Sequence, residues 1–121
     1  MRDGPIVKKS IDFSVSILSY SNLLNNKKQF VISNQLLKSG TSIGANVFEA
    51  QYSESRLDFI HKMKVALKEA NETFYWLTLC EKMEGLDVQQ EMIKSLHEIM
   101  SILSRIIITS KKNLNLNSKK E

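Results

Sequence analysis

The sequence has little of what several fold classes require. One proline and four glycines in 121 residues are too few for the turns of a many-stranded fold. The single cysteine, Cys80, cannot form an intramolecular disulfide, and its place on an apolar helical face predicts a small buried side chain. No window approaches the ~18 apolar residues of a membrane span, and Lys8, Lys9 and Asp12 interrupt the first apolar run. These absences favour an all-α, cytoplasmic protein with no membrane association.

The residues that are present suit one globular domain over residues 1–121, with 42% hydrophobic and 25% charged residues. Residues 10–110 hold ten basic and eleven acidic residues, whereas the two ends hold seven basic and two acidic residues, which together give the net charge of +4. The positive charge therefore sits at the ends of the chain. The basic residues there are Arg2, Lys8, Lys9, Lys111, Lys112, Lys119 and Lys120.

Hydrophobic periodicity predicts four helices, at about residues 5–24, 30–51, 55–83 and 87–111, followed by a basic tail, 112–121, that we expect to fray. Pro5 suits a first helical turn, and Ser55 with Asp58 is typical of a capping box. Gly85 is expected to end the third helix and Asp87 to cap the fourth. The short connections predict an antiparallel up-down-up-down four-helix bundle.

Each predicted helix has an apolar stripe for a shared core. In the first helix the stripe is expected on Ile11, Val15 and Leu18, widened by Phe13, Ile17 and Tyr20. The third and fourth helices carry more apolar residues than one face needs, which predicts self-association, with a thick monomeric core as the alternative. The surplus residues are Ile60, Leu67, Trp76 and Leu79, and Ile93, Met100, Ile102, Ile107 and Ile108.

Gly40 and Gly44 lie four residues apart in the second helix and leave one side with almost no bulk. Each mid-helix glycine costs up to ~1 kcal/mol relative to alanine, so we expect a neighbouring helix to approach closely there.

A polar set on the second and third helices is expected to meet between them. It consists of Asn46, Glu49, Arg56, Glu69 and Glu72. The set predicts either a recognition site or, preferably, a hydrogen-bond network that fixes helix register. The lysines at 38, 62, 64 and 68 interleave with acidic residues and are typical of an ordinary solvated face.

No arrangement of residues predicts catalysis. Asp58 and His61 have a metal-chelating spacing, but His97 is preceded by Lys94 where a dimetal bundle needs a second glutamate. Two histidines and one cysteine form no nucleophile–base arrangement, and the glycines form no phosphate-binding loop. We therefore predict no catalytic residue, no metal, no cofactor and no enzymatic activity.

The segment QLLKSGTSIGANVFEA, followed by SRLDFIHKMKVALKEANETFYWL, resembles four-helix bundle proteins encoded within intervening sequences of 23S ribosomal RNA genes. The resemblance covers about residues 11–83 by motif and the fourth helix by position. It implies a ring, expected to be a pentamer, and kinship with accessory proteins of diversity-generating retroelements, which bind nucleic acid and a reverse transcriptase. Members are often labelled ribosomal proteins, although this does not imply a structural part of the ribosome. The matching positions are Lys38, Ser39, Ser42, Ile43, Asn46, Glu49, Ser55, Phe59, Ala66 and Glu72.

The sequence thus predicts a non-enzymatic oligomer that binds RNA or DNA backbone without sequence preference through a basic pole. The alternative is a scaffold that binds another protein and has no direct nucleic-acid role. The candidate nucleic-acid-binding residues are Lys8, Lys9, Lys111, Lys112, Lys119 and Lys120. The candidate packing and assembly residues are Gly40, Gly44, Asn46, Glu49 and Glu72.

Overall fold

The computed structural model describes residues 4–120, with side chains described for residues 4–115. Within this range the chain forms helices and no strand, which confirms the all-α class. The helices are α1 (Pro5–Asn26), α2 (Phe30–Ala50), α3 (Arg56–Lys82) and α4 (Gln90–Lys120).

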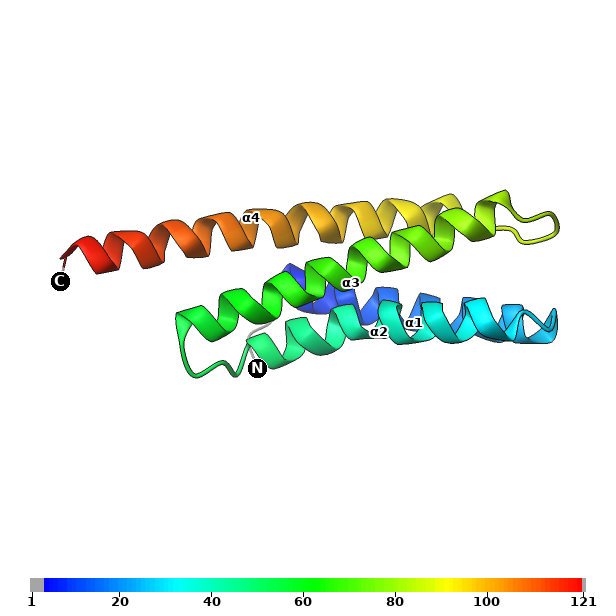
Figure 1. The fold of residues 1–121 in the computed structure, drawn as a ribbon, viewed down its shortest axis with the longest axis horizontal. Helices are drawn as coiled ribbons and strands as arrows, with labels where there is room; N and C mark the ends of the chain where they lie inside the picture. Colours follow the sequence, from blue (N-terminus) through cyan, green and yellow to red (C-terminus); the bar gives the residue numbers. More distant parts are fainter. Residues whose placement is uncertain (1–3, 121) are drawn as a thin grey trace.

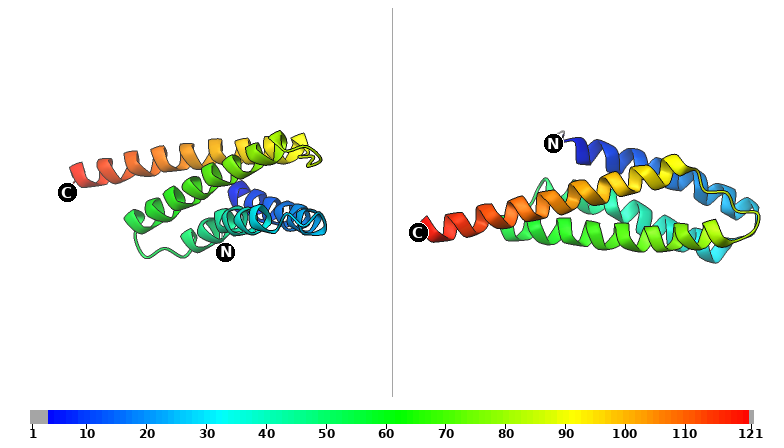
Figure 2. Two further views of the ribbon diagram at one scale, coloured as in Figure 1. Left: turned by 45° about the vertical axis from the view of Figure 1, so that its right-hand side comes forward. Right: turned by 90° about the horizontal axis from the view of Figure 1, so that it is seen from above.

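The chain turns back at each connection between successive helices, as Figure 1 shows. α2 packs against both α1 and α3, and α4 packs against both α3 and α1. The end of α4 projects past the other helices on the side of the molecule where α1 begins (Figures 1 and 2). Within residues 4–120, none of the helices combines the length and the hydrophobicity of a membrane span.

Local sequence explains how the helices begin and how the chain turns. Pro5 occupies the first turn of α1, and the Ser55 side chain accepts a hydrogen bond from the Asp58 amide at 3.0 Å, as predicted. Gly85, in the α3–α4 connection, has φ of 85°, a left-handed conformation that glycine adopts without steric cost.

The predicted start of α4 at Asp87 is wrong, because the helix begins three residues later, at Gln90. Leu86 is buried and Val88 is half-buried, so residues 86–89 cross the end of the core before the helix begins. The first turn is instead closed by the Met92 amide, which donates to the Gln89 carbonyl at 3.0 Å.

The predicted end of the fourth helix at residue 111 is also wrong, because α4 continues to Lys120 and includes residues 112–120 of the basic tail. No glycine or proline follows Gly85, so nothing in the sequence stops the helix.

The prediction of which side chains of α1 face the core is wrong. Phe13, Ile17 and Tyr20 are buried, with exposed fractions of 2%, 0% and 7%, and the buried stripe continues from Ile6 to Leu24. Both sets of residues have helical spacing, but the buried stripe is longer and carries the aromatic side chains, so it removes more apolar surface from water. The other set is exposed at 43%, 57% and 47%, and its residues are Ile11, Val15 and Leu18.

The apolar faces of the other helices supply the rest of the core. Ile60 and Ile107, which the sequence placed in the apolar surplus, are buried at 5% and 7%, so the prediction that they lie outside the core is wrong. Leu36, Ile43 and Val47 of α2 are fully buried, as are Leu77 and Cys80 of α3. α4 contributes a fully buried line at positions 96, 99 and 103. The prediction of a buried Cys80 is confirmed.

Candidate functional site

The two lysines at the start of α1 each lie in an ion pair. Lys8 Nζ donates to Asp12 Oδ2 at 2.8 Å within α1, and Lys9 Nζ donates to Glu98 Oε2 at 2.9 Å, which joins α1 to α4. The hydrogen bond with Asp12 raises the pKa of Lys8, and the one from Lys9 lowers the pKa of the Glu98 carboxyl. A neighbouring carboxylate offsets each ammonium charge, so the start of α1 attracts phosphate weakly.

Lys111 and Lys112 are exposed on α4, and Lys111 lies against a lysine of α3. The close approach of the Lys64 ammonium lowers the pKa of Lys111. We call Lys64, Lys111 and Lys112 the lysine cluster. Sequence reasoning assigned Lys64 to a mixed surface, because only the packing of α3 against α4 brings it beside Lys111.

The last two candidate lysines, Lys119 and Lys120, belong to the helical backbone of α4. Their side chains lie outside the described residues, and so does Arg2. Their backbone positions place them on the part of α4 that projects past the bundle in Figure 1.

The two glycines of α2 face α1 at very short range. A Cβ on Gly40 would meet Ile17 Cγ1 at 2.8 Å, and a Cβ on Gly44 would meet Ser14 Oγ at 3.1 Å and the Ser10 carbonyl oxygen at 3.2 Å. α1 therefore occupies the space that the absent side chains leave free.

The polar residues expected between α2 and α3 make their described hydrogen bonds within their own helices. Asn46 Nδ2 donates to the Ser42 carbonyl at 2.8 Å, and Trp76 Nε1 donates to Glu72 Oε2 at 3.3 Å. Glu49 is exposed at the end of α2. Among the described residues, no hydrogen bond joins these side chains across the two helices.

Hydroxyl groups make the buried polar contacts between helices instead. Thr73 Oγ1 of α3 donates to Ser39 Oγ of α2 at 3.0 Å. Ser33 Oγ of α2 donates to the Ser21 carbonyl of α1 at 3.1 Å, and Ser21 Oγ donates to the Ser33 carbonyl at 3.3 Å. Sequence reasoning missed these contacts, since serines at small-residue helix positions carry no distinctive pattern.

The residues weighed for metal binding and nucleophilic chemistry have structural contacts. Asp58 accepts hydrogen bonds from Lys62 at 2.9 Å, which lower the pKa of its carboxyl, and His97 packs edge-on against Phe74 with ring centroids 5.0 Å apart. Burial raises the pKa of the Cys80 thiol, which disfavours the reactive thiolate. Within the described part of the chain, no three His, Cys, Asp or Glu residues converge as metal ligands do.

Exposed large apolar side chains occur on several helices, and α1 carries the most regular set. We call Ile11, Val15 and Leu18 the α1 stripe, since they follow one another at helical spacing on the side away from the core. Phe48 and Tyr52 add an exposed aromatic pair with centroids 5.8 Å apart at the end of α2.

Two comparisons with known proteins indicate the same family. The sequence pattern of the 23S rRNA-intervening sequence protein family matches residues 2–109. A crystal structure of a protein with unknown function from the S23 ribosomal protein family of Bacteroides thetaiotaomicron is 46% identical, covers 84% of this chain and 97% of its own, and superposes with a TM-score of 0.79. No curated protein matches the chain significantly.

Proposed function

This chain belongs to the 23S rRNA-intervening sequence protein family, and we propose that it is a cytoplasmic, non-enzymatic homo-oligomer of up-down-up-down bundles that binds RNA or DNA backbone nonspecifically. The lysine cluster is the main observation that supports nucleic-acid binding. Lys64, Lys111 and Lys112 are exposed on α3 and α4, which pack against each other, and an anionic phosphate there would offset their like charges. Phosphodiester backbone supplies such anions at regular spacing.

The proposed nucleic-acid-binding surface is the lysine cluster on α3 and α4, and it does not include the lysines at the start of α1. Lys8 and Lys9 are already ion-paired, whereas Lys111 and Lys112 lie at the base of the projecting end of α4. The chain from residue 110 onward falls outside the region that matches the family. The proposed surface therefore combines Lys64, inside the matched region, with Lys111 and Lys112 outside it.

Self-association is supported by the exposed apolar side chains of α1. The α1 stripe is the most regular apolar surface available for such a contact. The pentameric number rests on the family resemblance.

A charge-neutralising variant tests nucleic-acid binding. We expect Lys64→Gln/Lys111→Gln/Lys112→Gln to weaken binding to a labelled RNA hairpin and a labelled DNA duplex, and to flatten the log–log salt dependence by about 0.9 per lost phosphate contact on duplex DNA. Fluorescence anisotropy across a salt series measures both effects, and light scattering on the same samples reports the assembly mass.

The matched control is Lys27→Gln/Lys28→Gln/Lys82→Gln, which removes three exposed lysines at the opposite end of the bundle. The control should bind nucleic acid like the parent. Equal weakening of both variants would show that net charge alone governs binding and would contradict the assigned surface.

A protein-interaction scaffold is the second candidate function, and the exposed α1 stripe favours it. Deleting residues 112–121 separates the two functions. The nucleic-acid proposal requires weaker binding with assembly intact, whereas the scaffold requires that the parent protein bind no nucleic acid even at low salt.

A further inference from the structure

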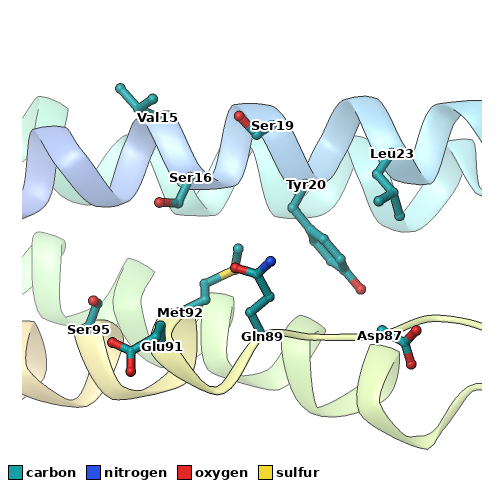
Figure 3. A pocket seen from close by; sticks show the side chains of 10 residues that line it. All are labelled: Val15, Ser16, Ser19, Tyr20, Leu23, Asp87, Gln89, Glu91, Met92 and Ser95. Carbon is teal, nitrogen blue, oxygen red and sulfur yellow. The ribbon is translucent and has the colours of Figure 1, made fainter.

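A groove separates α1 from the segment that leads into α4 and from the start of α4 (Figure 3). Its volume is about 450 Å³, within the range of small-molecule sites. The lining residues are Val15, Ser16, Ser19, Tyr20, Leu23, Asp87, Gln89, Glu91, Met92 and Ser95.

Tyr20 gives this groove an unusual polar group. The residue is only 7% exposed, and its buried hydroxyl lies near the Cys80 thiol, a weak acceptor, without a nitrogen or oxygen partner among the described residues. Figure 3 shows the ring reaching from α1 across the groove toward Asp87 and Gln89. Burial raises the pKa of Tyr20, and the nearby Cys80 thiol and the carboxylate of Asp87 raise it further. A buried polar atom without a partner is rare in folded proteins and calls for an explanation.

The charge in the groove is negative. Asp87 and Glu91 line it from the side of α4, and the lining set contains no lysine or arginine. Val15, Leu23 and Met92 supply apolar surface between the polar groups. This combination suits a ligand with cationic ends and an apolar middle.

We propose that the groove binds an aliphatic diamine or polyamine. Its ammonium groups would donate hydrogen bonds to the carboxylates of Asp87 and Glu91, and its methylene chain would lie along Val15 and Met92. An ammonium has three donors and no acceptor, so it can also donate to the Tyr20 hydroxyl oxygen. Gln89 is exposed at the edge of the groove, beside the Tyr20 ring.

The site is independent of the proposed nucleic-acid surface. It is acidic rather than basic and is built from the second half of α1, the segment before α4 and the start of α4, whereas the lysine cluster lies toward the far end of α4. Failure of either proposal leaves the other standing.

Titration calorimetry with spermidine, in a buffer of physiological ionic strength, tests the site. We expect saturable binding at one site per chain, weakened at least about tenfold in Asp87→Asn/Glu91→Gln, since charge-assisted hydrogen bonds are lost. The control, Glu54→Gln/Glu69→Gln, removes the same charge outside the groove and should retain the parent affinity. Nonsaturable binding, or equal affinity in both double variants, would overturn the proposal.

Tyr20→Phe separates ligand binding from structural support. This variant should melt at the parental temperature or above, because it removes an unpartnered hydroxyl, and should bind spermidine several-fold more weakly. Parental affinity in this folded variant would remove the hydroxyl from the site. Displacement of spermidine by equimolar Mg²⁺ would show simple cation screening and would overturn the assignment to amines.

Discussion

The flank of α1 that faces α2 and the flank that faces α4 differ in the size and charge of the side chains between the helices. Toward α2, Gly40 and Gly44 let Ile17 and the Ser10 backbone approach to near the van der Waals limit. Toward α4, the Lys9–Glu98 ion pair bridges the helices, and the groove beside Tyr20 stays open. A single helix thus has one closely packed flank and one loosely packed flank.

The closely packed flank of α1 contributes stability, whereas the loosely packed flank leaves room for a ligand. Close-packed contacts tolerate no added volume, so the α2 flank fixes the relative position of its two helices. The α4 flank leaves space, exposed carboxylates and an unpartnered hydroxyl, all of which are expensive in a core but useful in a binding site. The largest losses of stability should therefore follow substitutions on the α2 flank.

Gly44→Leu should give the largest effect in the molecule. Its Cβ alone would lie 3.1 Å from Ser14 Oγ, and the remaining atoms of leucine have no space, so we expect a loss of at least about 3 kcal/mol. Denaturant unfolding at fixed protein concentration measures the loss. Ala45→Leu is the matched control, because it adds bulk at the next, exposed position of α2 and should change the free energy of unfolding by less than about 0.5 kcal/mol. Similar unfolding midpoints for the two variants would contradict the close-packed flank.

The close-packed flank could be anticipated from the sequence, and the loose flank could not. Two mid-helix glycines at helical spacing already indicate a close neighbour. The buried stripe of α1 was not predictable from spacing, because Ile11 and Phe13 both begin sets with helical periodicity. The choice depends on how α2, α3 and α4 surround the helix, which is tertiary information.

The candidate sites show the same limit. Lys111 and Lys112 stand out from charge alone, but their neighbour Lys64 is 47 positions earlier than Lys111 in the chain (111 − 64) and is brought near by helix packing. Tyr20 looks like an ordinary core residue in the sequence. The surroundings of its hydroxyl depend on the path of residues 86–89, which the sequence does not predict.

Tyr20→Phe tests how well the loosely packed flank of α1 is packed. The hydroxyl is buried without a partner, so its removal relieves a desolvation cost, and we expect stability to rise by up to about 1 kcal/mol. Thermal and denaturant unfolding of the parent and the variant measure the change. A loss of stability would mean that the hydroxyl has a structural partner, and the α4 flank would then be as well packed as the α2 flank.

Glu98→Gln should have the smallest effect and tests what holds the loose flank together. The folded-state pKa of Glu98 is lowered by Lys9, so the ion pair contributes stability above the unfolded-state pKa of about 4.3 and loses it as the pH falls through the folded value. The melting temperatures of parent and variant should therefore differ slightly at pH 7 and converge once the pH falls below the folded-state pKa of Glu98. Both side chains are exposed by more than 40%, so added salt should reduce the difference.

Lys9→Gln should match Glu98→Gln, and the double variant should lose no more than either single variant, because all three remove one interaction. A difference that persists at acid pH would place the effect in side-chain packing, and the loose flank would then be held by contacts other than charge.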